Sequence, residues 1–312
     1  RNCLVGSEMC IRDRLYMLEF NSVENIKLTS QIFLKPEYAI HPTVSGNKIR
    51  KLKYNLDKFK KENYEGILTF GGAFSNHIAA TAAAGYALGI PTIGVIRGME
   101  VFTKIGSNPT LSYALKCGMK LEFISRAEYK LKTEKSYLAS LESKYPNYYI
   151  IPEGGTNHLA VKGCEEILTD EDRQFDVICC AVGTGGTLSG IINSSLPHQK
   201  IIGFPALKGA FLKQDICKFA KQSNWDLCQD YHFGGYAKVH LNLIEFINRF
   251  KREFKIPLDP IYTGKMLFGV FDMMDKGMFL KSQKVLAIHT GGLQGIEGMN
   301  QKLRKNNLDL MV

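Results

Sequence analysis

The sequence has no apolar run near the roughly 20 residues that a membrane-spanning helix needs, and its N-terminal part has no long apolar core of a secretory signal. The eight cysteines form no C-x-x-C pair, and no histidines and cysteines share the spacing of a zinc site. Internal repeats, low-complexity tracts and long Pro/Ser linkers are missing too. We therefore expect a cytoplasmic globular protein with free thiols, no membrane partner and no metal.

The distribution of charged residues argues against nucleic-acid binding. The formal net charge is +10, but Lys and Arg alternate with acidic residues, as in K-F-K-K-E, and are not interleaved with aromatic residues. We expect no nucleic-acid partner. The chain has 312 residues, of which 45% are hydrophobic, and this is enough to build the cores of one large or two ordinary domains.

The first fourteen residues, R-N-C-L-V-G-S-E-M-C-I-R-D-R, have no helix or strand period and look like translated adaptor sequence. We interpret residues 1–14 as a non-native extension.

The rest of the chain alternates between short β-rich runs and helix-like segments. One series contains I-L-T-F, T-I-G-V-I-R and K-L-E-F-I-S, and a second lies at 176–182, 200–204 and 284–289. This alternation predicts two α/β units with parallel sheets. Between the runs, Asn108 and Pro109 predict the start of a helix that continues through Lys116. The adjacent Cys179 and Cys180 lie in an apolar run and are expected to be buried.

Four glycine-rich turns come just after predicted strands, at the edge where such sheets bind ligands. The turns lie at Gly71-Gly72, Gly154-Gly155, Gly183 to Gly186 and Gly291-Gly292. The third turn, in V-G-T-G-G-T-L-S-G, opens a helix whose N–H groups attract phosphate. It lacks the lysine of a P-loop, and Leu188 stands where a dinucleotide fingerprint needs glycine. A phosphate cradle and a simple tight turn both remain open here.

The segment around Lys48 and the loop at 71–77 can be interpreted together with the glycine turn at 183–186. Lys48, in S-G-N-K-I-R-K-L, would by default be a solvated helix residue. A phosphate cradle without a nucleotide motif favours pyridoxal 5'-phosphate (PLP), which needs one lysine for its Schiff base. The loop G-G-A-F-S-N-H at 71–77 presents the N–H groups of Ser75, Asn76 and His77 at a helix start. These groups suit a substrate carboxylate, and a plain helix cap is the alternative.

Six motifs occur in order along the chain: S-G-N-K-I-R-K-L, G-G-A-F-S-N-H, P-E-G-G-T-N, G-T-G-G-T-L-S-G, D-P-I-Y-T-G-K and I-H-T-G-G. Together they resemble the 1-aminocyclopropane-1-carboxylate (ACC) deaminase/D-cysteine desulfhydrase family. The resemblance implies the tryptophan-synthase-β-like fold of fold type II PLP enzymes, with two doubly wound α/β domains. The large PLP-binding domain is expected at 15–50 plus 156–312, and the small inserted α/β domain at 51–155.

The resemblance also implies roles for individual residues. Lys48 would hold PLP as a Schiff base and move protons at the substrate Cα. The cofactor phosphate would be bound by Gly183, Thr184, Gly185, Gly186 and Thr187. Asn76 would contact the phenolic oxygen of the cofactor, and Ser75 with the amides around it, including His77, would hold the substrate carboxylate. Phe74 stands where relatives often have Gln.

Two threonines bear on the choice of reaction. Thr263 matches the position that faces the pyridine nitrogen, where ACC deaminases have a carboxylate that keeps the nitrogen protonated. A neutral threonine favours loss of a good β leaving group over opening of a cyclopropane ring. Thr290, in H-T-G-G, also matches the desulfhydrase form and is assigned to substrate binding. Tyr262 and Tyr236 match tyrosines near the reacting end of the substrate, although tyrosines are often half-buried packing residues.

The sequence therefore predicts a PLP-dependent lyase of amino-acid catabolism that converts D-cysteine to pyruvate, sulfide and ammonia. ACC deamination to 2-oxobutanoate and ammonia is the alternative within the same chemistry. A PLP-binding protein without turnover is the alternative from another class. The resemblance further suggests a homodimer.

Overall fold

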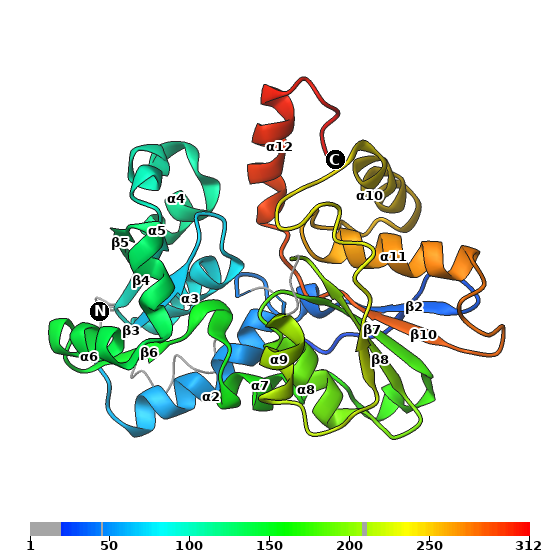
Figure 1. Cartoon of the computed structure of the whole chain (residues 1–312), viewed down its shortest axis with the longest axis horizontal. Coiled ribbons are helices and arrows are strands. Elements are labelled where there is room, and N and C mark those ends of the chain that lie inside the picture. The colour runs from blue at the N-terminus through cyan, green and yellow to red at the C-terminus, as the bar shows by residue number, and fades with distance from the viewer. Residues whose placement is uncertain (1–19, 45, 208–210) are drawn as a thin grey trace, which may run out of the picture.

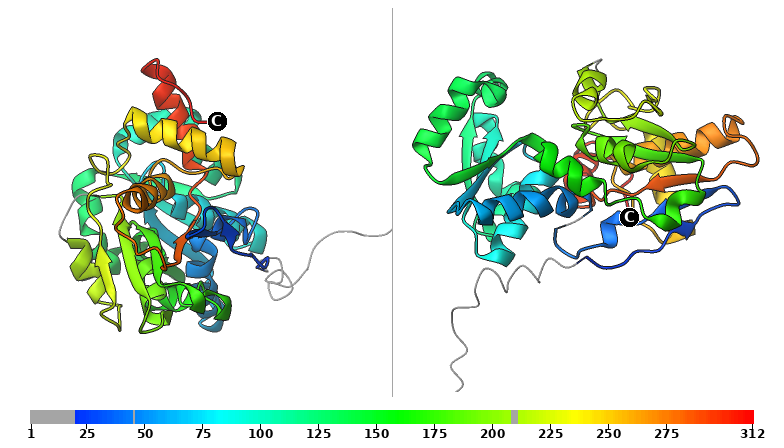
Figure 2. Two further views of the ribbon diagram at one scale, coloured as in Figure 1. Left: turned by 90° about the vertical axis from the view of Figure 1, so that its right-hand side faces the viewer. Right: turned by 90° about the horizontal axis from the view of Figure 1, so that it is seen from below.

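The computed structural model describes residues 20–44, 46–207 and 211–312, so the predicted extension at 1–14 lies outside the described residues. Figure 1 shows two lobes, each built around its own sheet, and Figure 2 shows them side by side with α2 (Asn47–Lys61) and α7 (His158–Cys164) between them. The described residues contain no helix long and apolar enough to cross a membrane.

The larger sheet has the order β1-β2-β10-β7-β8-β9, and all its neighbours are parallel except β1 and β2. Its strands are β1 (Ile26–Lys27), β2 (Ile32–Lys35), β7 (Val177–Val182), β8 (Lys200–Pro205), β9 (Trp225–Leu227) and β10 (Val285–Ile288). The three runs predicted at 176–182, 200–204 and 284–289 thus form β7, β8 and β10. Apart from the exposed Lys200 at the start of β8, these strands are apolar because helices cover both faces of the sheet.

Strand β7 shows how this double burial is achieved. Val177, Cys179 and Ala181 pack into the core under α10 (Leu241–Phe254) and α11 (Thr263–Asp275). Ile178 and Cys180 pack into the core under α8 (Gly186–Ser194) on the other face. Alternate side chains of a strand point to opposite faces, so every position of the run is buried. As predicted, both cysteines are buried packing residues, and each is a free thiol.

The smaller sheet has the order β5-β4-β3-β6 and is parallel throughout. Its strands are β3 (Gly66–Gly71), β4 (Thr92–Arg97), β5 (Lys120–Ile124) and β6 (Tyr148–Ile151), and all of them lie between β2 and β7 in the chain. Two α/β units are therefore present. The proposed domain boundaries at 50/51 and 155/156 stay a prediction, and helix α2 runs through the first of them.

The remaining helices connect and cover the strands. They are α3 (Asn76–Leu88), α4 (Pro109–Lys116), α5 (Arg126–Tyr129), α6 (Lys135–Lys144), α8 (Gly186–Ser194), α9 (Phe211–Cys217), α10 (Leu241–Phe254), α11 (Thr263–Asp275) and α12 (Gly295–Lys305). Short 3-10 helices lie at Glu37–Ala39, Met99–Ser107, Lys130–Thr133, Glu153–Gly155 and Asp170–Gln174. Helix α4 begins as predicted, because Asn108 Oδ1 accepts the Leu111 N–H at 2.9 Å and Pro109 occupies the first turn.

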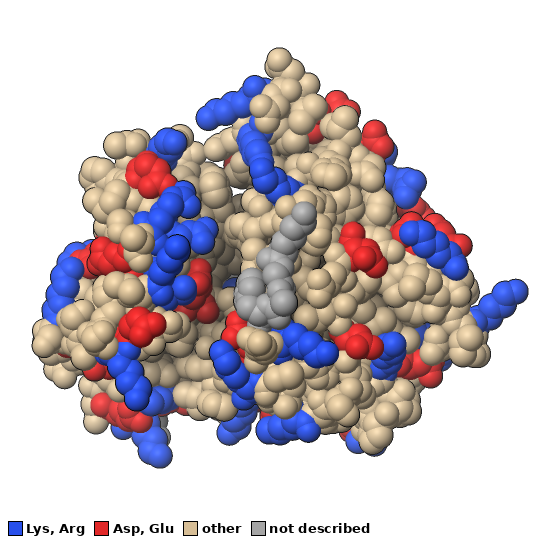
Figure 3. All heavy atoms as spheres, viewed as in Figure 1, with Lys and Arg blue, Asp and Glu red and all other residues tan. Residues whose placement is uncertain are grey.

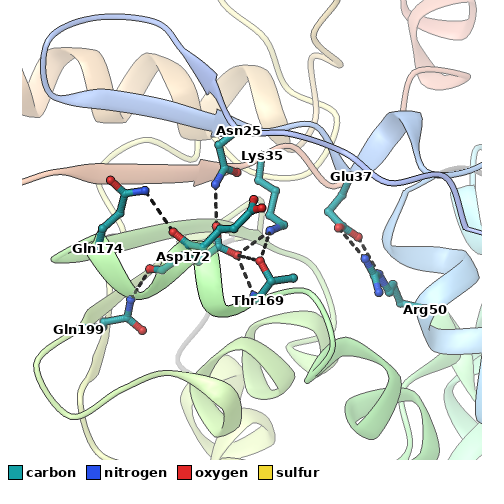
Figure 4. A network of polar contacts seen from close by, with 9 residues as sticks. Asn25, Lys35, Glu37, Arg50, Thr169, Asp172, Gln174 and Gln199 are labelled. Atoms are coloured by element: carbon teal, nitrogen blue, oxygen red, sulfur yellow. Dashed lines mark hydrogen bonds and ion pairs between the residues drawn. The ribbon is translucent and has the colours of Figure 1, made fainter.

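Buried ion pairs connect the first strands to the rest of the larger lobe (Figure 4). Lys35 Nζ lies 2.5 Å from Asp172 Oδ2, and the two side chains are only 3% and 1% exposed. The other oxygen of Asp172 accepts the Asn25 amide at 2.7 Å, and the Thr169 N–H donates to Oδ2 at 2.9 Å. Asp172 therefore neutralises a buried charge and also closes the turn that leads into β7.

We expect Asp172→Asn to destabilise the protein by about 3–5 kcal/mol, because it leaves the Lys35 ammonium buried without a counter-charge. Urea unfolding followed by circular dichroism measures this loss. Asp170→Asn is the matched control, since the Asp170 side chain is 89% exposed and its pair with Arg173 is on the surface. Equal shifts of the unfolding midpoint in both variants would show that the buried pair is not important.

Candidate active site

A cavity of about 1130 Å³ lies between the two lobes, at the hollow seen in Figure 3. It collects most of the predicted site residues from distant parts of the chain. Those that line it are Lys48, Ser75, Asn76, His77, Gly183, Thr184, Gly185, Thr187, Tyr236, Tyr262 and Thr290. Gly186 and Thr263 are buried directly behind neighbours that line the cavity.

Lys48 lies in the first turn of α2, and its backbone is positioned by a very close contact. A Cβ on Gly46 would stand 2.0 Å from the carbonyl oxygen of Thr290, and Gly46 has a φ of +60°. Only glycine fits such a contact and such a φ. The same carbonyl accepts the Asn47 N–H at 3.1 Å, so the loop after β10 fixes the start of α2.

The Lys48 amine is prepared to act as a nucleophile. Removal from water, followed by the nearby Lys51 charge, lowers its pKa from 10.5 to about 7. Its Nζ donates to Asn47 Oδ1 at 2.9 Å, and Asn47 Nδ2 donates to Thr187 Oγ1 at 2.6 Å. At neutral pH a large share of this amine is therefore uncharged, which is the form that attacks a carbonyl carbon.

The glycine turn between β7 and α8 has the features of a phosphate cradle. Gly185 has a φ of +83°, and no side chain caps the N-terminus of α8. A Cβ on Gly186 would come within 2.8 Å of the Thr156 side chain and 3.2 Å of Lys51 Nζ. The first N–H groups of the helix thus face a space that is bordered by hydroxyls and an ammonium group.

Lys51 is a site residue that the sequence analysis did not single out. It is 2% exposed, and its Nζ donates to Gly154 O and Thr156 Oγ1, both at 2.9 Å, and to Thr184 Oγ1 at 3.5 Å. Burial lowers its pKa. Its position three residues after Lys48 puts both lysines on one face of α2, and this spacing was the available signal.

The 71–77 loop leads from β3 into α3 as predicted. The Ser75 hydroxyl caps the helix by accepting the Ile78 N–H at 3.3 Å, and the Ser75 N–H already donates to Gly72 O at 3.0 Å. The N–H groups of Asn76 and His77 lie in the first turn of α3, where no intrahelical acceptor exists. Capping and carboxylate binding therefore both fit this loop, with the Ser75 hydroxyl hydrogen and two amides as donors.

Tyr262 and Tyr236 lie together on the cavity wall with ring centroids 6.2 Å apart. Removal from water raises the pKa of both phenols, and for Tyr262 the nearby Tyr236 raises it further. Both phenols therefore keep their protons at neutral pH, and they can act as proton donors rather than as bases.

Thr263 and Thr290 differ in what they face. Thr263 is fully buried, and its hydroxyl donates to Asp259 Oδ2 at 2.5 Å, whereas Thr290 lines the cavity. Asp259 also accepts the N–H groups of Tyr262 and Thr263 at 2.7 and 2.8 Å. Asp259, which closes the turn before α11, is a further residue near the site that was not among those predicted from the sequence. The role of Thr263 at the pyridine nitrogen stays a prediction.

The histidines near the site act as braces. His77 Nε2 lies 2.8 Å from Thr69 Oγ1, whose own hydrogen is donated to Ile151 O, so the imidazole must be the donor. His289 connects Pro257 O at 2.8 Å with the Gly291 N–H at 3.2 Å. Burial lowers the pKa of both imidazoles, so both remain neutral.

This set of groups fits PLP. The phosphate matches the uncapped helix N-terminus, the Thr184 and Thr187 hydroxyls and the Lys51 ammonium, which no acidic residue in the described part of the chain pairs with. The aldehyde matches the partly deprotonated Lys48 amine. Asn76 also lines the cavity, and a Cβ on Gly292 would stand 2.9 Å from its Nδ2.

Comparison with known proteins agrees with this fit. The family model described as pyridoxal-phosphate dependent enzyme matches residues 17–291. A Pyrococcus furiosus protein provisionally named 1-aminocyclopropane-1-carboxylate deaminase is 30% identical over 293 residues, which cover 85% of this chain and 86% of the relative. The Arabidopsis thaliana mitochondrial protein named bifunctional D-cysteine desulfhydrase/1-aminocyclopropane-1-carboxylate deaminase is 27% identical, covering 86% of this chain and 73% of the relative.

Solved structures show the same fold. A crystal structure described as that of an ACC deaminase homologue has a TM-score of 0.80 at 24% identity and covers 96% of this chain and 99% of its own. A hydrogen sulfide-producing enzyme from Fusobacterium nucleatum has a TM-score of 0.64 at 16% identity, with 90% and 98% covered.

These findings confirm the predicted fold class, the predicted family and the predicted cofactor class. The assignments of individual residues to cofactor or substrate stay predictions, supported by their geometry. The chain belongs to the pyridoxal-phosphate dependent enzyme family and, within it, to the ACC deaminase/D-cysteine desulfhydrase group of PLP-dependent lyases.

Proposed function

We propose that the protein breaks down D-cysteine to pyruvate, hydrogen sulfide and ammonia. The single observation that carries the proposal is the placement of Lys48, whose pKa is lowered to about 7, in one cavity with the glycine turn at 183–187 and the loop at 71–77. The amine and the residues predicted to bind phosphate and carboxylate thus line one cavity, which supports the proposal. The names of the Arabidopsis thaliana and Fusobacterium nucleatum proteins, which refer to a desulfhydrase and to sulfide production, agree with the proposal.

Each step can be given to a residue of the cavity. The Ser75 hydroxyl and the amides of Asn76 and His77 hold the substrate carboxylate. Bound PLP supplies an electron sink for the negative charge that develops at the substrate Cα. The neutral Lys48 amine accepts the proton from Cα.

Departure of sulfur completes the reaction. The Cβ–S bond breaks with its electron pair on sulfur, and the protonated phenol of Tyr262 or Tyr236 gives the leaving sulfur a proton. One D-cysteine and one water yield one pyruvate, one hydrogen sulfide and one ammonia, so the overall reaction is redox-neutral.

ACC deamination is a second candidate because the Pyrococcus furiosus relative and the ACC deaminase homologue carry that name. Thr290 lines the cavity and favours desulfhydrase activity. The family resemblance implies a leucine at this position in members that open the cyclopropane ring. Non-catalytic PLP binding is the third candidate, and convergence of all three sites on one cavity speaks against it.

A substrate panel is the direct test of the proposed function. We expect the PLP-loaded protein to release sulfide and pyruvate from D-cysteine and no 2-oxobutanoate from ACC, because D-cysteine carries a β leaving group. Sulfide and keto acids are assayed separately, with L-cysteine alongside for stereochemistry. Release of 2-oxobutanoate from ACC would favour the second candidate. A loaded protein that is inert to every compound would favour the third.

Lys48→Ala should lose the visible absorbance of lysine-bound PLP and reduce turnover by about 10²- to 10⁴-fold, since no amine remains to move the proton. Absorbance spectra and sulfide release measure the two effects. Lys58→Ala on the same helix is the matched control, because the Lys58 side chain is 40% exposed and lies outside the cavity lining. Normal absorbance in Lys48→Ala would refute the role of Lys48.

Cofactor loading should depend on pH through Lys48. The folded-state pKa of this lysine lies below its ordinary value, so the reactive neutral form increases as the pH rises through about 7. We expect the rate of PLP uptake by cofactor-free protein, followed by absorbance, to rise through about 7 and then level off. A rise centred near the ordinary lysine value would show that burial does not activate the amine.

A further inference from the structure

The cavity wall carries an excess of positive charge. Its three acidic residues are each already paired with a cation of the same wall. The pairs are Glu100 with Arg126 at 2.5 Å, Glu153 with Lys132 at 3.4 Å, and Asp215 with Lys218 at 2.6 Å. Every negative charge of the lining is therefore neutralised locally.

Four cations at the cavity mouth are left over. Arg97, Lys104, Lys302 and Lys305 line the cavity, and none forms an ion pair with an acidic residue among residues 20–44, 46–207 and 211–312. Figure 3 shows Lys and Arg side chains on both sides of the hollow between the lobes. Such a mouth attracts ligands with more than one negative charge.

Arg97 is the cation placed next to the substrate loop. It is the last residue of β4, and its Nη2 lies 3.6 Å from the point where a Cβ on Gly72 would stand. Its Cζ lies 5.8 Å from the centre of the Tyr129 ring, and it lines the cavity together with Tyr236, whose pKa burial raises and the Arg97 charge lowers. The cation that acts on Lys48 is Lys51 instead. Arg97 therefore lies at the tyrosine side of the substrate space.

We infer that Arg97 binds a negatively charged group on the β substituent of the substrate, and that the enzyme accepts small amino acids with anionic leaving groups such as a phosphate ester. This inference rests on the proposed function and names a wider substrate class for the same site. The planar guanidinium can donate two parallel hydrogen bonds to a phosphate. The α-carboxylate does not need Arg97, because Ser75 and the first turn of α3 supply its donors.

The reaction balances for such a substrate. With O-phosphoserine, the Cα proton goes to Lys48, the Cβ–O bond breaks, and its electron pair leaves with the phosphate. One O-phosphoserine and one water then give one pyruvate, one ammonia and one phosphate. No oxidant or reductant is needed.

The test compares two ligands that differ only by the phosphate. Binding of O-phospho-D-serine and D-serine to the PLP-loaded protein is followed by the change in the visible absorbance of the cofactor, and both L enantiomers are run in parallel. We expect the phosphorylated ligand to bind about 10- to 100-fold more tightly, as charge-assisted hydrogen bonds to arginine allow. Arg97→Gln should remove most of this difference and leave D-serine affinity unchanged.

Arg252→Gln is the matched control, because Arg252 is also exposed but lies on α10 outside the cavity lining. It should bind both ligands like the unchanged protein. Equal weakening of D-serine and O-phospho-D-serine by Arg97→Gln would show that Arg97 holds the α-carboxylate and would overturn the inference. The inference would also be overturned if the protein without substitutions bound O-phospho-D-serine no more tightly than D-serine.

D-cysteine turnover, measured on the same preparation, separates this inference from the proposed function. Sulfide release without a preference for the phosphorylated ligand would refute the inference alone. A preference for the phosphorylated ligand that Arg97→Gln removes, without sulfide release, would support the inference and refute D-cysteine as substrate.

Discussion

The site depends on one backbone contact, the approach of Gly46 to the carbonyl group of Thr290, where a Cβ would stand only 2.0 Å from the oxygen. This contact places the first turn of α2 against the loop that follows β10 of the larger sheet. The same helix packs its buried side chains Leu52, Leu56 and Phe59 against the smaller lobe. One helix thus carries Lys48 and Lys51 into the space between the two sheets, and the sharp turn at its start fixes their direction.

Helix α2 places the buried Lys51 and the half-buried Lys48 on one face, where keeping both amines charged costs free energy. Lys51 donates to three oxygen atoms of the glycine turns, whereas the one acceptor of Lys48 Nζ within the described residues is Asn47 Oδ1. The charge of Lys51 and the loss of water therefore act mainly to remove the proton from Lys48. Lys51, which borders the predicted phosphate cradle, thus also lowers the pKa of Lys48, so one arrangement would serve both predicted roles, phosphate binding and Schiff-base formation.

Much of the fold could be predicted from the sequence because its signals are local. Apolar runs such as D-V-I-C-C-A-V become strands buried on both faces, and Asn108 with Pro109 starts α4. The glycine turns and Lys48 could be predicted as site residues for the same reason, since each belongs to a short sequence motif. Asp259 was missed because its partners Tyr262 and Thr263 are local and a turn-closing carboxylate has no distinctive spacing. Lys51 and Arg97 were missed for another reason, since their roles come from contacts across the fold. Lys51 meets Thr184 across 133 residues, and nothing near Arg97 in sequence shows that Gly72 lies beside it.

Asp259 also changes how the threonine at position 263 should be interpreted. As a residue type, threonine is a neutral partner for the pyridine nitrogen and hence predicts a weak electron sink. In the structure its hydroxyl hydrogen is donated to Asp259, so toward any other group Thr263 Oγ1 can only accept. An acceptor with a carboxylate behind it favours a protonated ring nitrogen, which strengthens the electron sink. Residue 263 alone therefore does not decide between loss of a β leaving group and ring opening, and the side chains that line the cavity, among them Thr290, Tyr236 and Tyr262, have to be considered with it.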